Sequence, residues 1–300
     1  MSTTTQATPM DTVPVDARTA AAIEAAEARA WADLYAAAPL AWAQAVGHGA
    51  REIGGALVLH WRATGRRYFS RAIGLGVTAP ASEQALDAIL ACWEELGIDA
   101  FLVQSLPHCA PAEYERWLRV RGLEPFDAQD RIVRGGQPAS ALPAAIGDRE
   151  LAVERVEPAS AGEWSDFLQR VYGLDTGSWL PRLIGRPGWH QYVAREDGAI
   201  VAARGMFIGS DGWAWLGMDG PVPGLMTQDY APDAALCAVM VEDGLAHGAR
   251  GFLTDVEAPS ATQDTPAYGA FAALGFTRPY VRTHWTRVVD GAHVQAATAA

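Results

Sequence analysis

Three carboxylates in the second half of the sequence have the spacing expected of acid–base chemistry or of an amine-binding site. Asp255 and Glu257 belong to an apolar run, residues 251–257, that predicts a strand, and their i, i+2 spacing places both side chains on one face of it. Two carboxylates on one face repel each other, which raises the pKa of one of them and suits a general base near neutral pH. The same pair could instead bind a cationic amine or form an ordinary solvated strand end. Asp219, at the end of the strand-like run WAWLGMD, is a third candidate base.

Other motifs with catalytic potential are weak. GLGVTA at 74–79 fits a dinucleotide-binding G-x-G-x-x-A pattern, but no βαβ unit with a ribose-binding acid follows it. His108 and Cys109 are adjacent, and adjacent side chains usually point apart, so we interpret them as structural residues. The histidines show no metal-ligand spacing such as HxxxH, so no metal site is expected.

The composition excludes several classes of protein. All 23 basic residues are arginine because the sequence contains no lysine, and this excludes Schiff-base chemistry, pyridoxal phosphate, a Walker lysine and a kinase lysine. The formal net charge of −12 argues against a general nucleic-acid binder. Three widely spaced cysteines, together with the lack of a long apolar run or a signal-peptide pattern, predict a soluble cytoplasmic protein without membrane contact.

The 300 residues fit two domains of roughly 150 residues each. Residues 1–17 and 290–300 predict a disordered N-terminus and a disordered tail. Residues 135–149 combine Gly, Pro and Ser with little periodicity and predict a linker between domains at 18–134 and 150–289. The periodic runs predict helices that include 18–46, 82–96, 161–172, 178–185, 232–247 and 265–274, and strands that include 52–61, 67–77, 190–196, 199–209, 212–219, 251–257 and 278–289.

Segments from the two halves of the sequence resemble each other at a nearly constant separation. ILACWEELGIDAFLVQ at 89–104 aligns with MVEDGLAHGARGFLTD at 240–255, and YERWLRVRGL at 114–123 aligns with AYGAFAALGF at 267–276. A helix–strand–helix order that recurs in this way indicates an internal duplication. The alternative is a chance similarity of two helix–strand–helix segments.

The second half of the sequence resembles the Gcn5-related N-acetyltransferases, the GNAT superfamily. The segments that carry the resemblance are GRPGWHQYVAREDGAIVAARGMF, WAWLGMD, the helix 232–247 with Glu242-Asp243, GFLTDVE, and AYGAFAALGF before the last strand. Over roughly residues 20–288, the chain looks like a bacterial two-domain form in which a degenerate GNAT-like domain precedes a second one. The resemblance implies an α/β fold with a mixed sheet and helices on both faces, splayed between the fourth and fifth strands to admit a pantetheine arm.

The resemblance also implies that acetyl-coenzyme A or another acyl-coenzyme A is the co-substrate. In the family, backbone N–H groups of a loop with the pattern Q/R-x-x-G-x-G/A bind the pyrophosphate at a helix N-terminus. Asp229 and Ala231 take the two small positions of that loop here, and the carboxylate of Asp229 adds like charge next to a pyrophosphate. The residues that the resemblance assigns to the cofactor are Leu216, Met218, Gln228, Tyr230, Ala231 and Phe271.

For the chemical step, the resemblance implies a tyrosine on the last helix that protonates the leaving thiolate. Phe271 occupies that position here, so Tyr268, one helical turn earlier, is the candidate acid. Asp219 or Glu257 is the candidate base, and backbone N–H groups where the strand 212–219 splays would polarise the acyl carbonyl. The candidates for binding the acceptor amine are Tyr192, Trp215 and Asp255.

The leading hypothesis is a cytoplasmic N-acyltransferase that transfers an acyl group to a primary amine of a small molecule. Its site would lie in the C-terminal half of a monomer or homodimer, without a metal and without nucleic-acid or membrane partners. The alternative is a GNAT-fold protein that has lost acetyl-coenzyme A use and serves as a ligand-binding or interaction module, or catalyses a different reaction. Asp229, Tyr230 and Phe271 favour this alternative.

Overall fold

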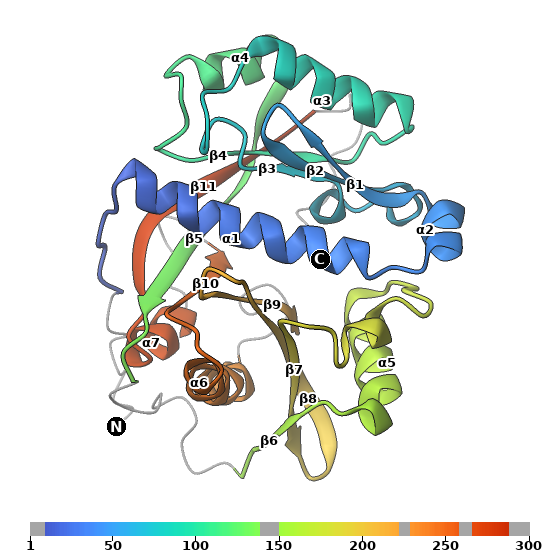
Figure 1. Cartoon of the computed structure of the whole chain (residues 1–300), viewed down its shortest axis with the longest axis vertical. Helices are drawn as coiled ribbons and strands as arrows, with labels where there is room; N and C mark the ends of the chain where they lie inside the picture. Colours follow the sequence, from blue (N-terminus) through green and yellow to red (C-terminus); the bar gives the residue numbers. More distant parts are fainter. Residues whose placement is uncertain (1–9, 139–149, 222–228, 258–265, 288–300) are drawn as a thin grey trace, which may run out of the picture.

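The computed structural model describes residues 10–138, 150–221, 229–257 and 266–287. All named strands of this part of the chain join one mixed 11-stranded sheet in the order β1-β2-β3-β4-β11-β5-β10-β9-β8-β7-β6, which confirms the expected α/β class (Figure 1). The strands are β1 (His48–Ile53), β2 (Ala56–Trp61), β3 (Arg71–Ile73), β4 (Leu102–Ser105), β5 (Leu123–Gly135), β6 (Ala152–Arg155), β7 (Trp189–Glu196), β8 (Ala199–Ile208), β9 (Trp213–Gly220), β10 (Gly251–Glu257) and β11 (Thr277–Arg287). The helices are α1 (Ala17–Ala36), α2 (Leu40–Val46), α3 (Glu83–Glu95), α4 (Tyr114–Val120), α5 (Ala161–Tyr172), α6 (Ala231–Ala246) and α7 (Pro266–Ala273).

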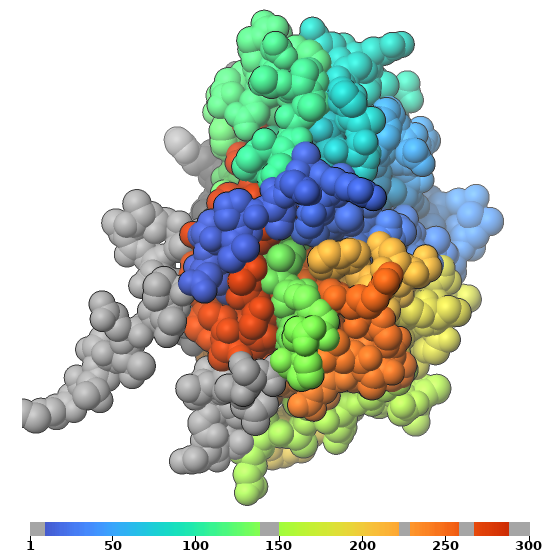
Figure 2. Space-filling view, turned by 60° about the vertical axis from the view of Figure 1, so that its left-hand side comes forward, coloured from blue at the N-terminus to red at the C-terminus, as the bar shows by residue number. Residues whose placement is uncertain are grey.

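The two halves of the chain exchange their last strands. β11, from the end of the chain, pairs with β4 of the first half, whereas β5 of the first half pairs with β10 of the second. β5 and β11 also pair with each other, antiparallel, in the middle of the sheet. Figure 2 shows the end of β5, in green, seated among the red and orange segments of the second half. Each half therefore completes the sheet of the other.

The order of elements in the first half recurs in the second half. α1, β1–β3, α3, β4, α4 and β5 correspond in order to α5, β7–β9, α6, β10, α7 and β11. The strand register follows the sequence duplication. Gln104 of β4 faces His284 of β11, and Asp255 of β10, which aligns with Gln104 in the duplication, faces Arg131 of β5. This arrangement approximates a two-fold symmetry about the centre of the β5–β11 pair.

Helix α1 lies across the sheet where the two halves meet (Figures 1 and 2). Its N-terminus is capped by Asp16, whose side chain accepts a hydrogen bond from the backbone N–H of Thr19 at 2.7 Å. Pro39 separates α1 from α2, so the single helix expected at 18–46 forms two helices. α1 and α5 bury their apolar residues against one face of the sheet, and α3, α4, α6 and α7 pack on the other face.

Three local expectations need correction. Residues 10–16 are ordered rather than disordered, because the N–H of Val13 donates to the carbonyl of Arg278 at 3.1 Å and Met10 is buried. The strand expected at 67–77 is reduced to the short β3, since a 3-10 turn precedes it and Gly74 follows with φ 86°. The helix expected at 178–185 is a single 3-10 turn, Leu180–Leu183.

Some expectations fall on residues that the structure does not describe. These are residues 1–9, most of the expected linker (139–149) and the tail at 290–300. Among the described helices, none combines the length and the apolar character needed to cross a membrane.

Candidate active site

The fourth and fifth strands of the second half, β9 and β10, separate halfway along their length. In the described chain they pair only between Trp213–Trp215 and Gly251–Leu253. Beyond this point Met218 has φ 55°, which is rare for a residue other than glycine, next to a register shift between β8 and β9. Gly217 lies against the ring of Trp215, where a Cβ atom would come within 2.1 Å of it. A cavity of about 170 Å³ opens at this splay.

The cavity is lined mainly by aromatic and aliphatic side chains from both halves of the chain. The rings of Trp31 on α1 and Trp215 on β9 have centroids 5.5 Å apart, and those of Trp61 and Trp179 meet edge to face at 5.4 Å. Such a lining suits a ligand with an apolar body. The other apolar and tyrosine side chains around it are Leu34, Tyr68, Phe69, Leu168, Tyr172, Leu174, Leu180, Leu216, Met218, Val256 and Phe271.

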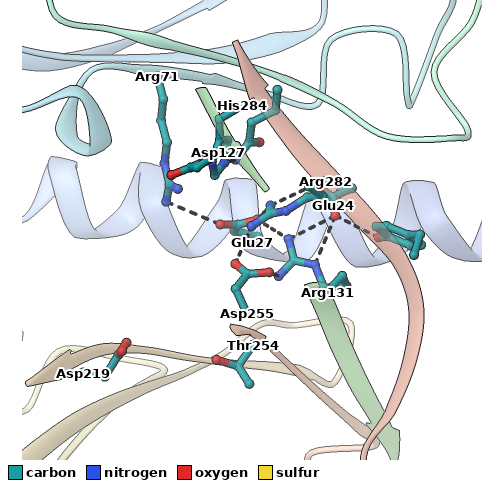
Figure 3. A network of polar contacts seen from close by, with 12 residues as sticks. Glu24, Glu27, Arg71, Asp127, Arg131, Asp219, Thr254, Asp255, Arg282 and His284 are labelled. Carbon is teal, nitrogen blue, oxygen red and sulfur yellow. Dashed lines mark hydrogen bonds and ion pairs between the residues drawn. The ribbon is translucent and has the colours of Figure 1, made fainter. Parts of the chain in front are cut away.

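A network of buried ion pairs lies beside the cavity, between α1 and the exchanged strands (Figure 3). Glu24 and Glu27 of α1 are buried and accept hydrogen bonds from Arg131 and Arg282. Nη1 of Arg131 lies 3.1 Å from Oδ1 of Asp255, and Arg282 donates to Oδ2 of the same residue. Asp255 lines the cavity, but two guanidinium groups hold its carboxylate, so it is part of the scaffold and not a free base or amine ligand.

Asp219 approaches the cavity from the end of β9, next to a second buried ion pair. Nη1 of Arg204 donates to both carboxylate oxygens of Asp233, at 2.6 and 2.7 Å, and Nη2 donates to Thr254 at 2.9 Å. Oδ1 of Asp219 lies 3.9 Å from the same Nη2. Tyr172 donates its hydroxyl hydrogen to the backbone carbonyl of Asp219. Asp219 is therefore held near a cation that is already paired with Asp233.

Glu257 is the cavity carboxylate best suited to act as a base. It lies at the exposed end of β10 and lines the cavity. Within the described residues, no hydrogen bond or ion pair engages its carboxylate. Partial burial, and then the nearby carboxylate of Asp127, raise the pKa of Glu257 above its ordinary value. A carboxylate with a raised pKa accepts protons more readily near neutral pH, as a general base must.

Arg71 brings a buried guanidinium to the cavity from β3 of the first half. Its Nη2 lies 3.4 Å from Oε1 of Glu27, and its Cζ lies 4.2 Å from the ring centroid of Trp31. Nε of Arg71 is buried and has no hydrogen-bond acceptor among the described residues. Because a guanidinium carries five N–H donors, Arg71 retains donors for a ligand.

The N-terminus of α6, where the family binds pyrophosphate, already carries a carboxylate. Oδ1 of Asp229 accepts a hydrogen bond from the N–H of Ala231 at 3.2 Å. Pro232, the next residue, has no N–H to offer. The side chain of Tyr230 is buried in the apolar core under α6, and Gln228 lies outside the described residues. The described part of this helix end therefore offers a pyrophosphate fewer backbone donors than a bare helix N-terminus would.

The last helix, α7, presents Phe271 rather than Tyr268 to the cavity. Phe271 lines the cavity, and its ring centroid lies 5.6 Å from Cζ of Arg204. The hydroxyl of Tyr268 instead donates to Asp130 of β5, and Nη1 of Arg278 lies 3.4 Å from it. Tyr268 is outside the cavity lining, so the structure does not place it where an acid would meet a ligand.

Tyr192, a candidate for binding the acceptor, lies outside the cavity in the core under α6. Its hydroxyl donates to Asp243 of that helix. Asp243 also neighbours His190 and His247, and the possible ligand atoms of these three residues lie within 4.8 Å of one another. The sequence spacing did not indicate this grouping, which could hold a metal ion. None of the four residues lines the cavity, so they are separate from the candidate site.

The first half of the chain supplies cavity residues that the sequence analysis did not identify. They are Glu27, Trp31, Leu34, Trp61, Tyr68, Phe69 and Arg71. One signal was present in the sequence: Glu24 and Glu27 share the apolar face of an alanine-rich helix with Ile23, and a charged residue on a buried face requires a partner. The sequence pattern could not say which arginine that partner is.

Comparisons with known proteins bear on the fold. No protein-family model matches the chain, and no curated protein matches it. A GCN5-related N-acetyltransferase from Kribbella flavida is similar in structure, with 17% identity and a TM-score of 0.54 over 85% of this chain and 96% of that one. A GCN5-related N-acetyltransferase from Sphaerobacter thermophilus has 17% identity and a TM-score of 0.50 over 82% of this chain and 83% of that one. The chain therefore has the fold of the GCN5-related N-acetyltransferases, with the GNAT order of elements present in each half.

Proposed function

We propose that the protein is an N-acyltransferase that transfers an acyl group from acyl-coenzyme A to the primary amine of a small molecule. The observation that carries the proposal is the splay between β9 and β10, which opens into a cavity lined in part by Glu257. A splay at the same strands is what the resemblance to the family implies for thioester binding. The GNAT fold of the two solved structures supports the same reading.

The residues at the splay fit the thioester end of the donor. Acyl-coenzyme A supplies an activated carbonyl carbon when it is bound. Leu216, Met218 and Phe271 offer apolar surface to a pantetheine arm. Because β9 pairs with β10 in the described chain only up to Trp215, backbone N–H groups beyond that point can donate to the acyl oxygen.

Glu257 has the role of base in this reaction. It accepts a proton from the ammonium group of the acceptor, and the free amine then attacks the carbonyl carbon. The N–C bond forms, the C–S bond breaks with its electron pair leaving on sulfur, and the second proton of the attacking nitrogen passes through water to the thiolate. A thiol has a pKa of about 8.5, so the thiolate is an adequate leaving group without a tyrosine at Phe271.

The measurement that tests the proposal is thiol release from acetyl-coenzyme A in the presence of a panel of primary amines. We expect release that depends on both reactants and falls at least about 100-fold in Glu257→Gln, since a general base contributes that much or more. Glu52→Gln, which changes an exposed carboxylate on β1, is the matched control.

The carboxylate of Asp229 on the N–H of Ala231 favours a second candidate function, a GNAT-fold protein that no longer uses acetyl-coenzyme A. Absence of thiol release with every amine, together with no coenzyme A binding in calorimetry, would support this candidate and overturn the transferase.

A further inference from the structure

We propose that the acceptor is an α-amino acid with one apolar ring or a branched alkyl side chain, whose carboxylate binds Arg71. This inference rests on the proposed function and specifies its acceptor. It follows from the distribution of donors, acceptors and apolar surface around the cavity.

The first half of the chain provides donors without acceptors. Nε of Arg71 and the indole Nε1 atoms of Trp31 and Trp61 are buried, and none has a hydrogen-bond partner among the described residues. All three residues line the cavity. Leaving a buried donor unpaired is costly, so acceptor atoms of a ligand would be favoured on this side of the cavity.

Arg71 is the charged member of this group. Among the described residues its one ion pair, with Glu27, is long at 3.4 Å, and Glu27 is shared with Arg131 and Arg282. Figure 3 shows Arg71 reaching α1 from the opposite side to Asp219 and Thr254. A planar guanidinium with free N–H donors binds a carboxylate through two parallel hydrogen bonds. A ligand carboxylate would therefore complete the coordination of this guanidinium.

The second half of the chain contributes carboxylates, which accept hydrogen bonds, to the cavity. Asp219 and Glu257 line the cavity at the splay, and Arg71 lies on the first-half side. Asp219 is 3.9 Å from the nearest guanidinium nitrogen, and Glu257 has no ion pair among the described residues. Carboxylates and unpaired donors at one cavity match a zwitterion, whose ammonium group would lie at the splay where the acyl carbon is delivered.

The volume and the lining define the side chain of the ligand. A cavity of about 170 Å³ is close to the roughly 150 Å³ apolar cavity that binds one benzene molecule. Trp31, Trp61, Trp179 and Trp215 give the ring edges and faces with which an apolar ring packs well. One ring, or an alkyl group of similar size, fits a space of this volume.

The first test is a ligand comparison by calorimetry on the full chain, without an acyl donor. The probes are L-phenylalanine, 2-phenylethylamine, which lacks the carboxylate, and 3-phenylpropanoate, which lacks the amine. We expect L-phenylalanine to bind at least about tenfold more tightly than either analogue, since a hydrogen bond to a charged group is worth that much or more. Equal affinity of 2-phenylethylamine and L-phenylalanine would overturn the proposal.

The second test uses Arg71→Met, which keeps the length of the side chain and removes the charge. The substitution should weaken the binding of L-phenylalanine at least about tenfold. The affinity for 2-phenylethylamine should stay within about threefold of that of the wild type. Arg116→Met, at an exposed position of α4, is the matched control. An equal loss for both ligands would contradict a carboxylate contact. If Arg71→Met does not fold, the ligand comparison on the wild-type chain decides alone.

Thiol release with acetyl-coenzyme A separates this inference from the proposed function. If amines without a carboxylate are acylated as well as amino acids, the acyltransferase stands and the amino-acid acceptor is wrong. If L-phenylalanine binds with the expected preference but no amine is acylated, the ligand class stands and the transferase is wrong.

Discussion

The carboxylate of Asp255 on β10 faces the guanidinium of Arg131 on β5, with 3.1 Å between Oδ1 and Nη1. At the equivalent place in the other half, Gln104 of β4 faces His284 of β11, and their Nε2 atoms are 3.1 Å apart. The two halves thus place a polar pair at the same point of the exchanged strands, but the pair is ionic in one half and an amide with an imidazole in the other. Asp255 lines the cavity, whereas Gln104 does not.

Replacing Glu24 should destabilise the whole fold. Its buried carboxylate accepts hydrogen bonds from Nε of Arg131 at 3.2 Å and from the hydroxyl of Tyr280 at 2.8 Å. Glu24→Gln leaves more guanidinium than carboxylate charge in a buried network, so the free energy of unfolding should fall by about 3–5 kcal/mol in urea denaturation. The same change at Glu115, half exposed beside Arg119, should cost less than about 1 kcal/mol. If Glu24→Gln lowers the free energy of unfolding by less than about 1 kcal/mol, the buried network does not hold α1 in place.

Stability should also depend on pH through Glu27. Burial acts to raise the pKa of Glu27, but the guanidiniums of Arg131, Arg282 and Arg71 outweigh it and hold this pKa well below its ordinary value of 4.5. A carboxylate with a lowered pKa in the folded state contributes stability above its unfolded pKa and loses it as the pH falls toward the folded value. The difference in unfolding free energy between wild type and Glu27→Gln should therefore be largest above pH 5 and shrink toward pH 3. A difference that does not change with pH would contradict this assignment.

Three candidate residues from the sequence lie at the second-half side of the cavity. Asp219, Glu257 and Trp215 all line the cavity, because each belongs to β9 or β10 and the family resemblance places the splay between these strands. Two other candidates, Tyr268 and Tyr192, lie outside the cavity lining. Helical or strand periodicity groups side chains on a face, but it does not say which neighbour covers that face, and here Asp130 and Asp243 pair with the two hydroxyls.

The residues that the first half contributes to the cavity could not be predicted from the sequence. Trp31 reaches the cavity because α1 crosses both halves, and Arg71 reaches it from β3 of the first half. Such contacts join residues separated by well over 100 positions, and no local propensity encodes the choice between an exchanged and an unexchanged last strand. The periodic pattern therefore predicted both halves but not how they are joined.

The acid limb of the pH–rate profile should belong to Glu257. Because partial burial and Asp127 raise the pKa of Glu257, its ionised fraction falls as the pH drops through a value above the ordinary 4.5, and kcat/KM should fall with it. Glu257→Gln should remove this limb and most of the rate, whereas Asp219→Asn should keep the limb. The check is kcat/KM for thiol release between pH 4.5 and 8.5 in all three proteins. A limb retained in Glu257→Gln and lost in Asp219→Asn would transfer the role of base to Asp219.

Removing the charge of Asp229 should strengthen coenzyme A binding. Asp229→Asn keeps a side-chain oxygen that can accept from the N–H of Ala231 but removes like charge near a pyrophosphate. We expect coenzyme A to bind roughly 3- to 10-fold more tightly in calorimetry at low salt, with a smaller gain at high salt because salt screens the charge. Asp99→Asn, at an exposed position, is the control. Unchanged affinity would show that the pyrophosphate does not approach this helix end.

Enlarging the aromatic cavity should change which acceptors are used. Trp31 on α1 contacts Trp215 at a centroid distance of 5.5 Å and stacks beneath Arg71, so Trp31→Ala removes a two-ring side chain from the cavity wall. The space left should raise kcat/KM for two-ring acceptors relative to one-ring acceptors by about tenfold, at a stability cost of about 3 kcal/mol. Trp117→Ala, at a partly buried position packed against the separate core under α3 and α4, should also cost stability but leave this ratio unchanged. If the ratio stays constant in Trp31→Ala while the protein remains folded by circular dichroism, the acceptor does not occupy the space beside α1, and the cavity shared by the two halves is not the acceptor site.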